Sequence, residues 1–568
     1  MSPDAGNGAT PIEPGAPIEP TALIEPAALI EPAALIDIRG LAVDYRRDGH
    51  LTHALRGIDL RVERGERVAI VGESGSGKST AALALLGLLP HTGRVVAGSA
   101  KVAGVELAGA PERVARRIRG RVVGLVPQDP TVSLNPTQRI GHQVAEAVRL
   151  RGVPKPAVDA AVVEALTQAG IDDPVARAQQ YPHELSGGLR QRVLIAVALA
   201  GDPDVIVADE PTSALDVTVQ RRILDHLDAL VRERGIALVI ITHDLGVAAD
   251  RADRVLVLQD GLVVEQGAAV EVLARPAHAY TKRLVAAAPG LISPRPPHPQ
   301  PEAAPVLVRW EGVGKDFPLP RGSASTSLRA LDDVSLEARA GRTLAIVGES
   351  GSGKTTLLRI ALGLEKPTRG RVLFDGTDVT SLSWRAARPL RRRFQLVQQN
   401  PFSSLDPRFS IGRSIAEPLV SFGLGTRTTR RARVAELLEL VALPADAATR
   451  RPAELSGGQR QRAAIARALA IEPELLYLDE PVSALDVSVQ DQVLRLLARL
   501  QQDLGVGFVL VSHDLGVVAQ VAHEVAVMRR GRLLEQGTAA SVLAAPTHEY
   551  TGALLDAVPG RTLREAVA

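Results

Sequence analysis

Short apolar runs alternate with longer stretches of helical pattern along most of the chain. The runs RVAIV (67–71) and DVIVAD (204–209) are rich in β-branched residues and have the length of buried strands. AALALLGLL (81–89) reads instead as a buried helix of alanine and leucine. Strands that alternate with helices in this way form a parallel sheet covered by helices. The pattern therefore predicts the α/β class.

The whole pattern occurs twice. ELSGGLRQR (184–192) returns as ELSGGQRQR (454–462), ADEPTSALDV (208–217) as LDEPVSALDV (478–487), and ITHDLGV (241–247) as VSHDLGV (511–517). The two copies of each segment are about 270 residues apart, so the repeated unit is a domain rather than a short module. We expect one domain at 35–290 and another at 306–560, joined by the proline-rich linker 291–305 and followed by a C-terminal tail at 561–568.

Residues 1–34 have a different pattern. Isoleucine recurs every six residues from Ile12 to Ile36, and the first four copies are each followed by Glu-Pro. Proline removes a backbone donor at each repeat and blocks a continuous helix, so this segment is predicted to be a disordered tail. It is either a dispensable leader or a tether for docking.

Composition excludes several kinds of site, but it does not decide the function. Apolar residues make up 45% and charged residues 23% of the 568, and the net charge of +2 gives no argument for nucleic acid. The absence of cysteine excludes disulfides and thiolate metal sites. The apolar runs are shorter than the roughly 20 residues that a membrane span needs. The N-terminus lacks the pattern of a secretory signal, so a cytosolic location is expected.

Two glycine-rich loops, VGESGSGKST (71–80) and VGESGSGKTT (347–356), follow a predicted strand and precede a predicted helix. Glycine lets backbone N–H groups converge on a phosphate, and the helix adds its positive N-terminal end. The lysines of the two loops would reach the β- and γ-phosphates, and the hydroxyl after each lysine would bind Mg²⁺. The residues that fit this pattern are Gly72, Gly77, Lys78 and Ser79, and Gly348, Gly353, Lys354 and Thr355. Two copies in this context make a chance glycine turn a poor explanation.

Acidic residues and histidines follow other predicted strands. Asp209 and Asp479 end apolar runs, which places a carboxylate beside each loop as a candidate magnesium ligand. Glu210 and Glu480 come next and could polarise an attacking water. His243 and His513 also follow strands and could contact a γ-phosphate. By themselves these groups would be ordinary strand ends; the phosphate loops favour the catalytic interpretation.

Each half carries a second phosphate-binding pattern, LSGG at 185–188 and 455–458. The serine and two glycines open a helix, so hydroxyl and N–H groups converge on an anion. One domain already holds its triphosphate with the first loop, which leaves the second free for the nucleotide of the other domain. Two copies could thus complete each other's sites.

The order of these motifs resembles the nucleotide-binding domains of ABC transporters, over about 250 residues in each half. The resemblance implies a P-loop NTPase fold in each half, with a core parallel sheet, an antiparallel β subdomain and a helical subdomain. It implies ATP and Mg²⁺ as cofactors and an intramolecular dimer of the halves. Lys78 would face Ser456 and Gly458, and Lys354 would face Ser186 and Gly188.

Further roles follow only from the resemblance. Gln128 and Gln399 would bind Mg²⁺ and the nucleotide, and Asp216 and Asp486 would lie in dimer-contact loops. Tyr45 and Phe317 occupy the position whose ring stacks on adenine, although either could be a core residue. The remaining expected contacts with ATP are Ser74, Gly75, Thr80, Gly187, Ser350, Gly351, Thr356 and Gly457. Leu189 stands where the other half has Gln459, so the site with Lys354 loses a polar group near the ribose.

Finer features are similar to the oligopeptide, dipeptide and nickel importers: GESGSGKS, PQDPTVSLNP (127–136), QQNPFSSLDP (398–407), PAHAYTKRL (276–284) and PTHEYTGALL (546–555). The resemblance implies an ATP-hydrolysing motor for peptide uptake at the cytoplasmic face of the membrane. Its partners would be two integral membrane permease subunits, docked at 133–136 and 404–407, and an extracytoplasmic solute-binding protein, with no nucleic acid. The alternatives are an importer of nickel or another small solute, a tandem ABC protein acting on ribosomes or DNA, and a scaffold with inactive sites.

Overall fold

The structure of the chain, a computed structural model, describes residues 34–47, 49–212, 215–288, 304–318, 327–400, 404–483 and 485–567. The predicted tail at 1–34 and the linker at 291–305 therefore lie almost wholly outside the described residues. Ile36, the last isoleucine of the six-residue repeat, begins the first strand and is buried.

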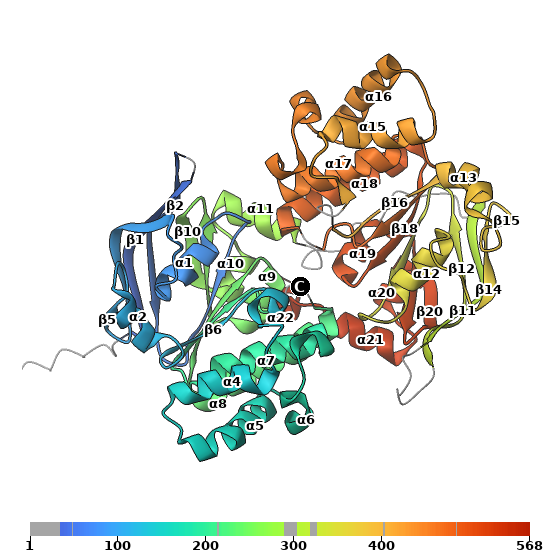
Figure 1. Cartoon of the computed structure of the whole chain (residues 1–568). Coiled ribbons are helices and arrows are strands. Elements are labelled where there is room, and N and C mark those ends of the chain that lie inside the picture. The colour runs from blue at the N-terminus through green and yellow to red at the C-terminus, as the bar shows by residue number, and fades with distance from the viewer. Residues whose placement is uncertain are drawn as a thin grey trace, which may run out of the picture. The chain divides into compact units, whose positions relative to one another are not determined.

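A six-stranded sheet forms the centre of the first half (Figure 1). Neighbouring strands are parallel except at one edge, where β10 runs antiparallel to β9. In order across the sheet the strands are β10 (Leu262–Ala268), β9 (Arg254–Gln259), β3 (Arg67–Val71), β8 (Ala237–Thr242), β7 (Val205–Asp209) and β6 (Val123–Val126). The central strands are apolar along their length because helices cover both faces of a parallel sheet.

A separate antiparallel sheet precedes and interrupts this core. Its strands, in order, are β2 (His50–Val62), β1 (Ile36–Arg47), β4 (Gly93–Val102) and β5 (Val105–Glu106). The helices of the first half are α1 (Lys78–Leu85), α2 (Glu112–Ile118), α3 (Pro130–Ser133), α4 (Ile140–Leu150), α5 (Val158–Gln168), α6 (Pro174–Ala178), α7 (Gly187–Ala200), α8 (Val217–Arg234), α9 (Leu245–Arg251), α10 (Ala269–Ala274) and α11 (Ala279–Ala287), with short 3₁₀ turns at Lys155–Ala157 and Pro182–Glu184. Helices α4 to α7 pack together as a helical subdomain.

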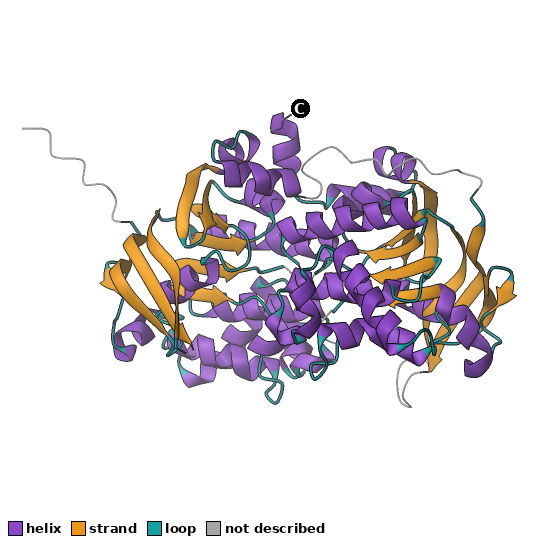
Figure 2. Cartoon of the chain, turned by 90° about the horizontal axis from the view of Figure 1, so that it is seen from above, coloured by secondary structure: helices purple, strands orange, loops and turns teal. Residues whose placement is uncertain are grey.

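The second half repeats this architecture. Its core sheet has the order β16 (Phe394–Val397), β17 (Leu475–Asp479), β18 (Gly507–Ser512), β13 (Thr343–Val347), β19 (Glu524–Arg529) and β20 (Arg532–Thr538), and its antiparallel sheet has the order β12 (Ser327–Arg339), β11 (Val306–Pro318), β14 (Arg369–Phe374) and β15 (Thr377–Asp378). Its helices are α12 (Lys354–Ala361), α13 (Trp384–Arg393), α15 (Ile411–Ser421), α16 (Arg427–Leu440), α17 (Gly457–Leu469), α18 (Val487–Leu504), α19 (Leu515–Val521), α20 (Ala539–Ala544), α21 (Glu549–Asp556) and α22 (Arg561–Val567), with 3₁₀ turns at Ala445–Thr449 and Pro452–Glu454. Figure 2 shows the two groups of strands with helices against them. The predicted α/β class and the subdomains of each half are confirmed.

Local sequence sets the ends of the elements, as α8 illustrates. The Asp216 carboxylate accepts a hydrogen bond from the Val219 N–H at 3.0 Å, which satisfies a free donor in the first turn. Gly235 ends the helix in the left-handed conformation, with φ of 62°. Helix α18 repeats both devices with Asp486 and Gly505.

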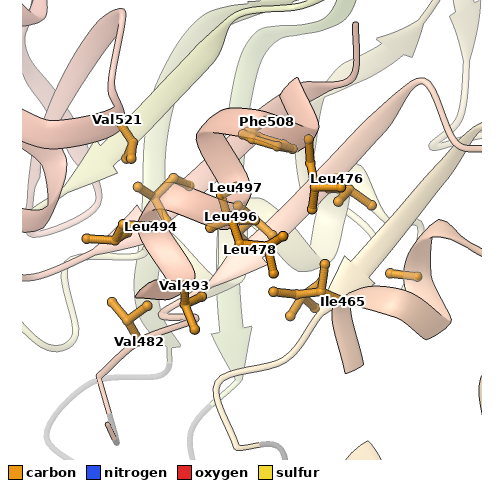
Figure 3. Close-up of a cluster of buried hydrophobic side chains, with 14 of the residues drawn as sticks. Ile465, Leu476, Leu478, Val482, Val493, Leu494, Leu496, Leu497, Phe508 and Val521 are labelled. Atoms are coloured by element: carbon orange, nitrogen blue, oxygen red, sulfur yellow. The ribbon is translucent and has the colours of Figure 1, made fainter. Parts of the chain in front are cut away.

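The hydrophobic core lies between each sheet and its helices. In the second half, Leu476 and Leu478 of β17 meet Val493 and Leu497 of α18 (Figure 3), and all four are at most 2% exposed. Leucine, valine and alanine supply most of this interior, as the low aromatic content requires.

Contacts between the halves occur within one compact unit that spans Ala34–Ala568. Helix α11 of the first half packs on α18, and α21 of the second half packs on α8. Residues 561–567, expected to be a tail, form helix α22, which lies against α9 and α10 of the first half (Figure 1). The Asp250 carboxylate accepts hydrogen bonds from the N–H groups of Gly560 at 2.7 Å and Thr562 at 2.9 Å, and Leu563 is buried.

Candidate functional site

Each glycine-rich loop joins a core strand to a helix in a conformation that only glycine tolerates. In the first half the loop connects β3 to α1. Gly72 has φ of 153° and a Cβ there would lie 2.3 Å from the Leu258 carbonyl oxygen; Gly77 has φ of 107° and its Cβ would lie 2.6 Å from the Ala54 carbonyl oxygen. Any side chain at these positions would force the backbone apart. The second loop, between β13 and α12, has the same restrictions at Gly348 and Gly353.

The lysine of each loop is buried and folds back over it. Lys78 Nζ donates hydrogen bonds to the carbonyl oxygens of Gly72 and Glu73, both at 2.8 Å. Lys354 Nζ makes the same bonds to Gly348 at 2.7 Å and Glu349 at 2.8 Å. Burial lowers the pKa of both lysines, and nearby carboxylates oppose that shift. A cation with so little solvent around it is a strong partner for phosphate oxygens.

The acidic pair at the end of β7 points its two carboxylates differently. Asp209 is the last residue of the strand, and Glu210 turns into the left-handed region with φ of 46°. The Glu210 N–H still donates to the Ile241 carbonyl oxygen at 2.8 Å. Glu480 also has φ of 46° and donates to Val511 at 3.0 Å. A non-glycine residue held in this region at both sites is strain of the kind found at functional positions.

Each of these glutamates contacts the glutamine and the histidine that were predicted for the same half. In the first half, the Glu210 carboxylate lies 2.7 Å from Gln128 Nε2 and 3.1 Å from His243 Nδ1. In the second half, the Glu480 carboxylate lies 2.8 Å from Gln399 Nε2 and 3.1 Å from His513 Nδ1. The three motifs therefore meet at one point in each half.

The charges in this group support one another. Burial works to raise the pKa of Glu210, but the hydrogen bond and charge of His243 outweigh it and hold the pKa below its ordinary value. Burial likewise works to lower the pKa of His243, and Glu210 outweighs it in the opposite direction. The same directions hold for Glu480 and His513. Glu210 and Glu480 are thus ionised at neutral pH, as a residue that orients water must be.

The surroundings of Asp209 fit a magnesium ion. Its Oδ1 is buried and has no hydrogen-bond partner among the described residues. Burial raises the pKa of Asp209, the Ser79 hydroxyl opposes that shift, and the adjacent charge of Glu210 adds to it. A carboxylate oxygen without a partner beside a hydroxyl offers the hard ligands that Mg²⁺ prefers. Burial and the charge of Glu480 likewise raise the pKa of Asp479.

A cavity of about 1120 Å³ contains most of the predicted site residues of both halves. Both phosphate loops line it, together with both glutamines, both glutamates and both histidines. The predicted residues of the first half that line it include Ser74, Gly75, Gly77, Lys78, Ser79, Thr80, Gln128, Glu210, Asp216 and His243. Those of the second half include Ser350, Gly351, Gly353, Lys354, Thr355, Thr356, Gln399, Glu480, Asp486 and His513. The halves thus face each other across the two loops.

The predicted dimer-contact loop of the first half touches the phosphate loop of the second half. Asp216 Oδ2 accepts a hydrogen bond from the Ser350 N–H at 3.3 Å, and the Thr218 hydroxyl donates to Glu349 Oε1 at 2.6 Å. Asp486 is close enough to Lys78 for its charge to act on the pKa of that lysine. Thr218 and Glu349 were not predicted as site residues: Thr218 directly follows the ADEPTSALDV motif, and Glu349 is a variable position inside the second glycine-rich loop.

The signature turns lie outside the set of residues that line this cavity. Of the described residues that line the cavity, none belongs to 186–188 or 456–458. Ser186 caps α7 by accepting a hydrogen bond from the Leu189 N–H at 3.4 Å. Ser456 caps α17 in the same way, and the Gln459 side-chain oxygen accepts a hydrogen bond from the Ser456 N–H at 3.0 Å. Leu189 cannot make this second bond, so the two signature helices begin with different caps.

The two candidate adenine-stacking rings also differ. Phe317 lines the cavity, with Lys315 Nζ 4.9 Å from its ring centre. Tyr45 is half-buried, and its hydroxyl lies 3.4 Å from Thr80 Oγ1, next to the first phosphate loop. Both rings thus lie near a phosphate loop, and only Phe317 lines the described cavity.

Replacing Phe317 with alanine is expected to weaken ATP binding at one site. Loss of a stacked ring removes about 1 to 3 kcal/mol, or roughly a 5- to 150-fold rise in the dissociation constant. Titration of the full chain with a fluorescent ATP analogue measures it. Phe409→Ala, which removes a half-buried ring under Arg413 and outside the cavity, is the matched control. Equal affinities in the two variants would exclude stacking by Phe317.

A pair of tyrosines at the site was missed. The Tyr280 hydroxyl accepts a hydrogen bond from the Glu73 N–H at 2.9 Å, and the Tyr550 hydroxyl accepts one from the Glu349 N–H at 3.2 Å. The repeated HAYT (278–281) and HEYT (548–551) were the available signal, although by themselves they indicate only the subfamily.

Comparison with known proteins identifies the class. The family model described as ABC transporter matches residues 55–213 and 331–483, and these ranges include a phosphate loop and a signature turn in each half. The chain therefore belongs to the ABC transporter family, with two ATP-binding cassettes in tandem. A second model, described as the oligopeptide/dipeptide transporter C-terminal region, matches residues 264–317 and 534–565.

Relatives place the chain more closely. It is 43% identical to the oligopeptide transport ATP-binding protein OppD of Mycobacterium tuberculosis, over 92% of this chain and 98% of the relative. It is 41% identical to the glutathione import ATP-binding protein GsiA of Salmonella paratyphi A, over 92% of this chain and 89% of the relative. A solved dimeric structure of the ATP-binding cassette MJ0796 with ADP and phosphate is 29% identical over 41% of this chain, with a TM-score of 0.38. The chain is an ATPase subunit of the ABC importer type.

Proposed function

We propose that the chain couples ATP hydrolysis at two composite sites to the uptake of peptides through partner permeases. The observation that carries this proposal is the cavity that both phosphate loops and both glutamates share. Each site would take its lysine and glutamate from one half and its signature turn from the other. Closure of the halves on ATP would drive the permeases, and hydrolysis with product release would reopen them.

Peptides are the proposed cargo because both named relatives act on them. OppD is described as an oligopeptide transport protein and GsiA as a glutathione importer, and glutathione is itself a tripeptide. The C-terminal region of each half matches the oligopeptide/dipeptide model. Cargo is selected by permease and solute-binding subunits, so the proposal concerns the assembly rather than a pocket in this chain.

The residues proposed to contact the permeases flank an exposed apolar side chain. Val132 in α3 is 82% exposed, directly before the predicted docking segment 133–136. Its side chain is therefore available for an apolar contact beside the docking segment. No helix in the described ranges is both long and apolar enough to span a membrane. We propose, from the importer relatives, that the chain reaches the cytoplasmic face of the membrane through its permeases.

Co-expression with the candidate permeases tests the function. The tagged chain is expected to retain two integral membrane subunits in detergent, and the reconstituted assembly with its extracytoplasmic solute-binding protein should take up labelled peptide only with ATP. Val132→Asp should reduce permease retention at least about tenfold, because it places a charge in an apolar contact. Val96→Asp, at another exposed valine in β4, is the control. Association with ribosomes or DNA in place of membrane subunits would contradict the proposal, and uptake of nickel without peptide would change the cargo.

Magnesium is proposed to bind at Ser79, Gln128 and Asp209, and at Thr355, Gln399 and Asp479. When bound, it would neutralise charge on the phosphate oxygens. Asp209→Asn with Asp479→Asn is expected to raise the Mg²⁺ concentration for half-maximal phosphate release by about tenfold or more. An unchanged Mg²⁺ dependence would exclude these carboxylates as ligands.

A further inference from the structure

The C-terminal region of each half reaches its own phosphate loop. In the first half, α11 carries Tyr280, which is 2% exposed, and its hydroxyl accepts the hydrogen bond from the Glu73 N–H. In the second half, α21 carries Tyr550, which is 5% exposed and does the same for Glu349. Both halves make this contact from the His-x-Tyr-Thr pattern that they share.

The residue that the tyrosine holds also holds the lysine. The Glu73 peptide donates its N–H to Tyr280, and its carbonyl oxygen accepts from Lys78 Nζ and from the Ser76 N–H. Glu349 is held in the same way between Tyr550, Lys354 and Ser352. A shift of this one residue would therefore displace the lysine and turn the first amides of the loop away from the phosphates.

Each tyrosine is itself held in place. In the second half, the Glu535 carboxylate accepts hydrogen bonds from the Thr547 N–H at 2.8 Å and the His548 N–H at 3.2 Å. His548 Nδ1 then accepts from the Tyr550 N–H at 3.0 Å and so caps α21. In the first half, Glu265 and His278 make the corresponding bonds. The segment from the glutamate to the tyrosine is thus fixed on the edge strand of the core sheet.

The environment keeps both hydroxyls neutral. Burial raises the pKa of Tyr280 and of Tyr550 to about 12, so neither ionises near neutral pH. The tyrosine rings pack in apolar clusters that also contain the first residue of the opposite half's α18 or α8, Val487 or Val217. Each tyrosine is therefore buried in a cluster with residues of both halves.

We propose that Tyr280 and Tyr550 are positioning residues that hold the phosphate loops, and their lysines, ready for ATP. This inference rests on the phosphate-loop assignment of the proposed function and gives a role to the C-terminal region of each half. Neither tyrosine is among the described residues that line the cavity between the phosphate loops. Their loss should therefore alter ATP binding rather than the chemical step.

Phenylalanine at both positions tests the proposal in the full chain, because it keeps the buried ring and removes only the hydroxyl. Loss of one hydrogen bond per site is expected to raise the dissociation constant for ATP about three- to tenfold, with kcat at saturating ATP unchanged. Hydrogen–deuterium exchange without nucleotide should become faster in the peptides that cover 71–80 and 347–356.

Tyr477→Phe is the matched control. Tyr477 is a buried tyrosine of the second half whose hydroxyl has no hydrogen-bond partner among the described residues. It should leave ATP affinity and loop exchange unchanged. The proposal is overturned if Tyr280→Phe with Tyr550→Phe leaves ATP affinity unchanged, lowers only kcat, or does no more than Tyr477→Phe. Failure of the unaltered chain to bind ATP would instead overturn the proposed function.

Discussion

Replacing both Glu210 and Glu480 with glutamine is expected to lower steady-state phosphate release by at least about 100-fold while ATP stays bound. A positioned general base contributes roughly 100- to 10,000-fold to a rate, and glutamine cannot accept the proton. Glutamine keeps the size of the side chain and can still bond to Gln128 or Gln399. The nucleotide should therefore be trapped, not excluded.

Phosphate release and retained nucleotide, measured on the same samples, check this result. Glu112→Gln removes an exposed carboxylate that pairs with Arg119 in α2 and should behave like the unaltered chain. Single variants at either site show whether the two sites contribute equally. Steady-state release at the original rate in the double variant would remove these glutamates from the mechanism.

Aspartate in place of Ser186 or Ser456 is expected to abolish trapping of ATP at one site each. Aspartate is a good helix cap and its charge suits a helix N-terminus, so α7 and α17 should keep their first turns. The same charge would repel a γ-phosphate brought against the turn. The damage should therefore appear only where the turn meets nucleotide.

Combined variants test which signature turn serves which phosphate loop. In a background of Glu210→Gln with Glu480→Gln, Ser456→Asp should cost one trapped nucleotide, and adding Lys78→Ala should cost no more. Adding Lys354→Ala to Ser456→Asp should instead empty both sites. Asparagine at the same serines caps a helix without charge and is the control. If Ser456→Asp with Lys354→Ala still traps one nucleotide, each signature turn serves its own half.

The sequence predicted the fold class and the residues that meet in each half because both depend on local pattern. Asp209 ends one strand of the parallel sheet, Glu210 comes directly after it, and His243 follows the neighbouring strand; parallel strands end at a common edge. The glycines of the loops are recognisable because no other residue adopts their backbone conformation. Both features can be predicted without knowing how distant segments of the chain pack.

The features that were not predicted depend on packing between segments far apart in the sequence. The HAYT pattern marks Tyr280 as a residue common to both halves, but it does not indicate that its hydroxyl reaches an amide 207 residues earlier. The docking of α22 on Asp250 was likewise missed, because a short C-terminal segment resembles a tail until its apolar Leu563 finds a partner. The phosphate loops could be found from motifs, whereas the groups that hold them had to be found in the structure.

The central claim is that each half supplies the amides that enclose the other half's triphosphate. A cryo-electron microscopy structure of the Glu210→Gln, Glu480→Gln chain with Mg²⁺ and ATP tests it most directly. We expect Ser456 and Gly458 to contact the γ-phosphate held by Lys78, and Ser186 and Gly188 to contact the one held by Lys354. Two occupied phosphate loops with both signature turns facing solvent would contradict the account.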